Sequence, residues 1–302
     1  MNFPKRPRWA TLLLVLLPLW LVASGGGALW YYFHREKKQA LVEQERFSQA
    51  VSTALIADDL RKIVEVIGER NASSETAAAN LSRTASMIEG LLGPSNTGYA
   101  VRKTKGPADW PILQVTLAGK ASDAPPVWVI TSYDSRAGSR GAEANATGLA
   151  ATLATAQALA RDKPTAPVHF IFLPHANDPE SPVVETAAKF LELAKLAGPP
   201  RAILCVEAMG AGEPLWLTSR DVSATPLNLV AGLGAVYGAD VVCLGDDSDL
   251  ASILFEMNLS AVRVATRPLV IATEQDGRLP FAATVAASTG RLIELIRRCG
   301  FK

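Results

Sequence analysis

A polar cluster follows the most apolar strand-like segment of the chain and is the first place to look for chemistry. Residues 127–131 are apolar and β-branched, as is typical of a buried parallel strand, and Ser132 and Asp134 follow directly. A glycine-rich segment, residues 138–148, and then a segment rich in Ala and Leu come next. Ligands of open α/β sheets bind beyond the carboxyl ends of the strands. We therefore expect this cluster at the edge of the sheet where an active site would lie.

Carboxylates and one imidazole elsewhere in the chain could join this cluster. Glu143 lies in the glycine-rich segment, and His175 and Glu207 each follow a predicted strand. These residue types are zinc ligands, so a metal centre is one possible chemistry. Asp249 ends an acidic run, residues 246–249, that could hold a hard cation, but we favour a helix cap there.

Serine hydrolysis is a second possible chemistry, because Ser132, Ser135 and Ser139 lie near His175 and Asp134 in the predicted arrangement. None of these serines lies in the Gly-x-Ser-x-Gly elbow that exposes a nucleophile at the top of such a sheet. We do not expect a serine hydrolase.

Composition limits the class of protein. The chain has 302 residues, of which 49% are hydrophobic, which suffices for one large α/β domain and an appendage. A net charge of +1 offers no case for nucleic acid as a partner. Cys205, Cys243 and Cys299 show no metal-binding spacing, and three cysteines do not indicate a disulfide framework.

The N-terminal segment has the character of a membrane anchor. Residues 10–33 contain no charged side chain, Lys5, Arg6 and Arg8 precede them, and aromatic residues mark both ends. A cleaved signal peptide is the alternative, but the apolar run continues past the small residues 22–25. We expect a single-pass membrane protein whose globular domain is periplasmic or extracellular. The expected parts are a tail and transmembrane helix (1–34), a helical stalk (35–57) and a globular domain (58–302).

Strands and helices are expected to alternate through the globular part. This pattern predicts an α/β three-layer sandwich, with a mixed, mostly parallel sheet between helices. The expected strands are 99–105, 111–117, 127–131, 168–173, 202–206, 215–218, 241–244 and 261–265. The expected helices begin at the capping residues Asp58-Asp59 and then span 75–92, 149–160, 183–197, 226–237, 250–257 and 279–299.

Five short motifs occur in an order that resembles a known family. They are residues 67–70 (Ile-Gly-Glu-Arg), 133–135 (Tyr-Asp-Ser), 141–148, 207–210 (Glu-Ala-Met-Gly) and 248–249 (Ser-Asp). With this order, residues 58–299 resemble the di-zinc aminopeptidases of peptidase family M-28. That family includes leucyl aminopeptidases, glutamate carboxypeptidase and the catalytically silent transferrin receptor and nicalin.

The resemblance implies a two-zinc centre whose ligands are mostly missing from this chain. Only Glu207 retains a carboxylate at an implied ligand position. Hydroxyl, methyl and amide groups cannot replace imidazole and carboxylate on zinc, so no zinc is expected. The substituted positions are Ser132 and Ala272 for histidine ligands, Ala144 for the bridging aspartate, Asn177 for a glutamate ligand and Ala176 for the general base.

Two functional hypotheses follow. We favour a degenerate, catalytically inactive relative that binds a peptide or protein partner in the vestigial crevice. The alternative is a hydrolase with a remodelled metal centre built from His175, Glu143 and Glu207 or Asp249. A one-residue shift along a strand changes the face that a side chain occupies, which weighs against the alternative. The vestigial crevice is defined by Ser132, Asp134, Glu143, Ala144, His175, Ala176, Asn177, Glu207, Asp249 and Ala272.

Overall fold

The computed structural model describes residues 51–178, 180–212, 215–220, 249–267 and 274–301, and near the N-terminus residues 16, 17, 20, 24–27, 30 and 31. The helix predicted at 226–237, the strand predicted at 241–244, Cys243 and Ala272 lie outside these residues. The chain divides into two units, Met1–Gln49 and Ala50–Lys302.

In the first unit the described residues are helical and exposed. Most of the predicted anchor, residues 10–33, lies outside the described residues. Within the described part of the chain, no helix combines the length and the apolar character needed to cross a bilayer.

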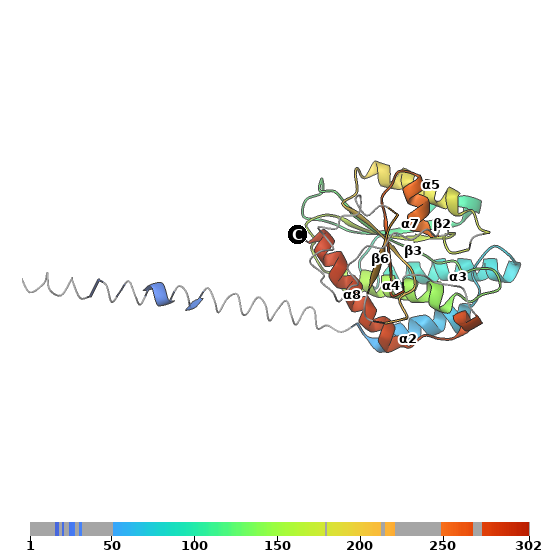
Figure 1. The fold of residues 1–302 in the computed structure, drawn as a ribbon, viewed down its shortest axis with the longest axis horizontal. Coiled ribbons are helices and arrows are strands. Elements are labelled where there is room, and N and C mark those ends of the chain that lie inside the picture. The colour runs from blue at the N-terminus through green and yellow to red at the C-terminus, as the bar shows by residue number, and fades with distance from the viewer. Residues whose placement is uncertain are drawn as a thin grey trace, which may run out of the picture. The chain divides into compact units, whose positions relative to one another are not determined.

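A seven-stranded sheet forms the middle layer of the second unit, in the order β1-β2-β4-β3-β5-β7-β6 (Figure 1). β4, β3, β5 and β7 run parallel, whereas β1, β2 and β6 join in antiparallel pairings. The predicted α/β fold with a mixed sheet is confirmed. Among the described strands, β2 and β6 run against the common direction of the other five, because β2 pairs antiparallel with both β1 and β4 and β6 pairs antiparallel with β7. The strands are β1 (Arg102–Lys105), β2 (Pro111–Leu117), β3 (Val127–Ser132), β4 (Val168–Leu173), β5 (Ala202–Val206), β6 (Trp216–Thr218) and β7 (Val262–Ala265).

Helices cover both faces of the sheet. In Figure 1, α2, α3, α4 and α8 lie on one side and α5 and α7 on the other. Side chains of β3 alternate between the two cores, with Val127 and Val129 in one and Trp128 and Ile130 in the other. Burial on both faces explains the unbroken apolar run of this strand. The helices are α2 (Thr53–Arg61), α3 (Glu75–Leu92), α4 (Thr147–Leu159), α5 (Val183–Leu196), α7 (Leu250–Glu256) and α8 (Ala282–Gly300).

Side-chain caps set the starts of α2, α3 and α7, and the first helix begins earlier than predicted. The hydroxyl of Ser74 caps α3 and the carboxylate of Asp249 caps α7, as predicted. The first helix does not begin at Asp58-Asp59 but at Thr53, because the Ser52 hydroxyl accepts from the amide of Leu55. The expected boundary between stalk and domain at residue 58 therefore falls inside α2.

Candidate functional site

The vestigial crevice lies at the carboxyl ends of β3, β4 and β5. Ser132 at the end of β3 pairs with Leu173 at the end of β4, and β5 runs parallel to β3 on its other side. The loops that follow these three strands therefore begin at one edge of the sheet. This is the predicted place for a site in an open α/β sheet.

Ser132 occupies the position of an implied histidine ligand and is bonded to Asn145 instead. The Asn145 side-chain amide donates to the Ser132 hydroxyl at 2.7 Å and to its carbonyl at 2.9 Å. The Asn145 side-chain carbonyl accepts from Arg70 Nη2 at 2.9 Å. A hydrogen-bonded serine and asparagine thus join the end of β3 to the start of the α4 segment.

Arg70 is completely buried, and its side chain hydrogen-bonds to several segments at this edge of the sheet. Burial lowers the pKa of its guanidinium to about 10, opposed by the charges of Asp134 and Asp276, so the group stays protonated at neutral pH. Its side chain donates to Asn145 and to the carbonyls of Ile63, Gly68, Tyr133 and Arg140.

Asp134 is fully buried and holds the loop after β4. Its carboxylate accepts from the backbone amides of Ala176, Asn177 and Asp178 at 3.1–3.2 Å. Burial raises the pKa of Asp134 to about 6, although the amides oppose that shift. The loop that would supply a general base and a glutamate ligand is thus fixed through its backbone.

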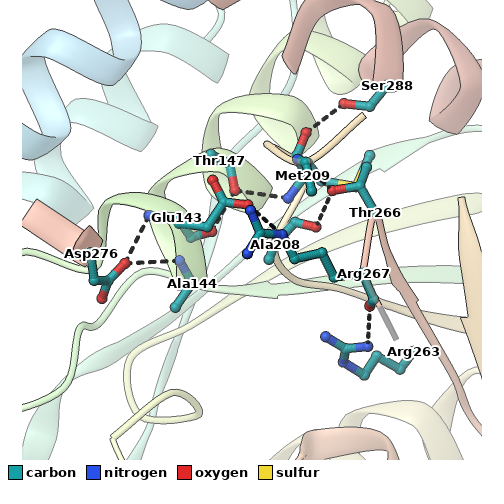
Figure 2. Close-up of polar contacts among 11 residues, drawn as sticks. Glu143, Ala144, Thr147, Ala208, Met209, Arg263, Thr266, Arg267, Asp276 and Ser288 are labelled. Atoms are coloured by element: carbon teal, nitrogen blue, oxygen red, sulfur yellow. Dashed lines mark hydrogen bonds and ion pairs between the residues drawn. The ribbon is translucent and has the colours of Figure 1, made fainter. Parts of the chain in front are cut away.

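Asp276 binds backbone amides beside Ala144, the position of the implied bridging aspartate. Its Oδ1 accepts from the amides of Glu143 at 2.8 Å and Ala144 at 3.1 Å (Figure 2). Its Oδ2 accepts from the Ser139 hydroxyl at 2.7 Å. These amides belong to the π-helix Ala142–Ala146 that leads into α4. A carboxylate is favourable there because helix N-termini present unbonded N–H groups.

Glu143 points toward Arg267 rather than toward a metal-binding group. Its Oε1 lies 3.7 Å from Arg267 Nε, and Figure 2 shows the two side chains together. Burial raises the pKa of Glu143, and the charge of Arg267 opposes this rise. The Glu143 carboxylate also packs against Gly210, where a Cβ atom would force this side chain to move.

Glu207, the one retained ligand type, forms an ion pair with Arg263. Arg263 Nε lies 2.5 Å from Glu207 Oε2, and the Arg263 side chain is 3% exposed while that of Glu207 is 27% exposed. Arg263 also donates to the carbonyl of Arg267. Burial raises the pKa of Glu207 and the Arg263 charge opposes the rise. The remaining carboxylate is therefore already neutralised by a cation of the protein itself.

The loop after β5 is held by hydroxyl groups from three elements. Thr147 accepts from the amide of Met209 at 2.8 Å, and Ser288 donates to the Met209 carbonyl at 2.7 Å. Thr266 donates to the Ala208 carbonyl and accepts from the amide of Ala211. Figure 2 shows these contacts around Ala208 and Met209. They fix the Glu207 loop without a metal ion.

His175 is buried and is not hydrogen-bonded to any of the candidate serines within the described structure. His175 is 1% exposed, and neither ring nitrogen has a hydrogen-bond partner among the described residues. Burial lowers the pKa of His175, which favours the neutral ring at pH 7. Its ring lies edge-on to Trp110, with the ring centroids 6.5 Å apart. No Ser–His contact therefore supports serine chemistry within the described structure.

The residues present do not fit a zinc centre. Over the described ranges, no three His, Cys, Asp or Glu side chains group as metal ligands, which includes the proposed trio His175, Glu143 and Glu207. The retained carboxylate is paired with Arg263, and Asp249 caps α7. Neither the two-zinc centre implied by the resemblance nor the remodelled single-metal centre matches this donor set.

Comparisons with known proteins agree with the fold. Residues 113–226 match the model of Peptidase family M28, so the resemblance to this family is confirmed over that stretch. The Legionella pneumophila LapA aminopeptidase is 14% identical, with a TM-score of 0.65 over 89% of this chain and 75% of that one. No curated protein matches.

Two further solved structures show the same fold. BSAP, a zinc aminopeptidase from Bacillus subtilis, is 10% identical, with a TM-score of 0.62 over 83% of this chain and 96% of that one. A Bacteroides thetaiotaomicron glutaminyl cyclase is 13% identical, with a TM-score of 0.57 over 81% and 97%. The fold thus occurs both in an aminopeptidase and in a glutaminyl cyclase, so the site must decide the function.

The sequence analysis assigned no role to Arg70, Arg263 or Asp276. Arg263 had a detectable signal, because an arginine interrupts the apolar strand β7 and a buried charge needs a partner. Arg70 ends the motif at residues 67–70, but the family resemblance implied no role for it. Their partners lie far away in the sequence, which concealed the contacts.

Proposed function

We propose that this protein is a membrane-anchored, catalytically inactive member of the M28-like fold that acts as a binding or scaffold module. The observation that carries the proposal is the Arg263–Glu207 ion pair, because it engages the one carboxylate left at an implied ligand position. Ala176 supplies no general base, and Asp134 and Asp276 are engaged by backbone amides. Such a site has no group positioned to activate water.

Turnover by the full-length chain is the first test. The expected result is no hydrolysis of aminoacyl or peptide substrates, with Zn²⁺, Mn²⁺ or Co²⁺ added in turn. Hydrolysis that is lost in Glu207→Ala and kept in a control such as Glu192→Ala would contradict the proposal. Glu192 lies on α5, where it pairs with Lys189 on the surface.

The anchor and the partner belong to the same proposal. Residues 10–33 would span the membrane once and leave the domain outside the cytoplasm. The vestigial crevice would hold a peptide or protein partner, with no nucleic acid involved. The full chain is expected to stay in the membrane after alkaline carbonate extraction, and its domain to be cut by external protease. Release by carbonate, or protection from external protease, would contradict the arrangement.

A further inference from the structure

A surface pocket lies at the opposite end of the sheet from the vestigial crevice. Its volume is about 440 Å³. It is lined by segments 97–99, 116–120 and 160–163, which come from the ends of α3, β2 and α4. Leu117 pairs with Val168 at the start of β4, which places the pocket at the amino ends of the parallel strands. The crevice lies at their carboxyl ends, so the two sites are separate.

The charged groups of this pocket favour an anion. Lys120 and Lys163 both line it, and neither has an ion-pair partner in the described structure. The only acidic lining residue, Asp162, accepts from Arg297 Nη2 at 3.0 Å, which offsets its charge. Leu117, Ala118 and Ala160 add apolar surface to the pocket, against which the aliphatic part of a side chain can pack. A short side chain that ends in a carboxylate therefore matches the lining of the pocket.

An unpaired strand edge begins beside the pocket. β1 is the first strand of the sheet order, so its outer side has no neighbouring strand among the described residues. Its pairing with β2 stops at Arg102 and Gln114, and the pocket is lined by the residues just beyond, Thr97 to Tyr99 and Thr116 to Leu117. An extended segment added to β1 would run toward the pocket.

The side chains of β1 are also cationic. β1 reads Arg-Lys-Thr-Lys; Lys103 pairs with Glu89 and Lys105 with Asp109, both through exposed side chains. Exposed ion pairs contribute little and can exchange for another acidic partner. Lysines on an edge strand also discourage pairing with an ordinary strand. The outer side of β1 is therefore expected to pair preferentially with a strand that carries acidic side chains.

We propose that β1 and this pocket form a docking site for an acidic peptide in extended conformation. Backbone groups of the peptide pair with the outer edge of β1, and one of its carboxylates enters the pocket between Lys120 and Lys163. Backbone pairing supplies affinity in this mode, while pockets for alternate side chains supply specificity. The site is independent of the inactivity proposed above.

Binding of a labelled peptide to the full-length chain in detergent tests the proposal. The probe is a fluorescently labelled, capped peptide of alternating Glu and Thr residues, and its binding is measured by fluorescence anisotropy. The control peptide has Lys in place of each Glu. We expect the acidic probe to bind and the basic one not to bind. The double variant Lys120→Glu, Lys163→Glu should weaken binding by about tenfold or more. The control double variant Lys195→Glu, Arg278→Glu makes the same charge change at exposed residues away from the pocket and should bind as the native chain does.

A proline on the edge separates peptide docking from simple anion binding. Lys103→Pro should abolish probe binding, because Gly106 N–H donates to the Trp110 carbonyl and the alternation of an antiparallel pair then turns the Lys103 N–H away from β2. Lys103→Ala should keep most of the binding, with thermal unfolding by circular dichroism confirming that both variants fold. Equal binding by the two charge-reversal variants would overturn the proposal. So would no binding of the acidic probe by the native chain, or competition by free glutarate at the same concentration as unlabelled peptide.

Discussion

The contact between Arg263 and Glu207 links a buried cation to the carboxylate at a position where the family resemblance implies a metal ligand. Each charge depends on the other, because an unpaired charge in a protein interior is costly. Arg263 is more deeply buried than Glu207. Removal of the Glu207 carboxylate should therefore lower the free energy of unfolding mainly because the Arg263 guanidinium is left buried without a partner charge.

Glu207→Met is expected to destabilise the protein by about 3 kcal/mol, because it leaves Arg263 buried without its carboxylate. Urea unfolding followed by circular dichroism measures the change. The double variant Glu207→Met, Arg263→Met should recover a large part of the loss. Arg61→Met removes a surface pair with Asp58 and should change stability by less than about 0.5 kcal/mol. Equal losses in the single and double variants would show that the pair is not coupled.

Asp59 in α2 makes the stability depend on pH. Its side chain is buried, no hydrogen bond to its carboxylate is found within the described structure, and burial raises its pKa to about 6 from 3.8. The folded protein therefore holds this proton more tightly than the unfolded chain does. The contribution of Asp59 to the free energy of unfolding should fall as the pH rises from about 4 to about 6, and stay constant above that.

Asp59→Asn should remove that dependence and stabilise the protein at pH 7.5 by about 2 kcal/mol. Urea unfolding at pH 4.5 and 7.5 checks both effects. Asp123→Asn, in the loop between β2 and β3, serves as an exposed control. If the free energy of unfolding of Asp59→Asn depended on pH as that of the native chain does, Asp59 would not be the group responsible.

At the scale of elements, α4 packs directly against the loop that follows β5. A Cβ atom on Gly148 would lie 2.0 Å from the carbonyl oxygen of Glu207. Backbone atoms cannot move aside as a flexible side chain would, so the approach of these two elements depends on glycine.

Gly148→Ala should therefore destabilise the protein by about 3 kcal/mol, as overpacking does. Gly90→Ala in α3 is the matched control, because nothing lies within 4 Å of its Cβ position. That control should stabilise α3 by about 0.5–1 kcal/mol. Thermal and urea unfolding of both variants give the comparison. A tolerated Gly148→Ala would mean that α4 and the loop can separate.

Local sequence signals predicted most elements but not every boundary. Ser74 and Asp249 were recognisable caps, whereas Asp58-Asp59 resembled a cap and in fact lies inside α2. The sequence around Ser52 did not stand out, because a capping serine has no feature that distinguishes it from any other serine. Strand direction at the sheet edges also depends on pairing partners rather than on the strands themselves.

At the largest scale, the described part of residues 50–302 has the fold of the M28-type aminopeptidases, and Ser132, Asp134 and Glu207 are bonded to other protein groups. From the order of the motifs, the sequence predicts that Ser132, Ala144 and Asn177 occupy positions where the family resemblance implies zinc ligands, and this stays a prediction. The hydrogen bonds now made at these positions could not be predicted, since Asp276 bonds amides more than a hundred positions earlier in the chain. Side-chain pairing at this distance follows from the fold rather than from local pattern.

Zinc content tests the central claim most directly. The full-length chain, purified in detergent, incubated with excess Zn²⁺ and dialysed, is measured by elemental analysis against its protein concentration. We expect far less than one zinc per chain, because Glu207 is paired with Arg263 and the other implied ligand positions within the described structure, Ser132, Ala144 and Asn177, lack imidazole and carboxylate groups. Close to two zinc ions per chain, lost in Glu207→Ala, would contradict this claim.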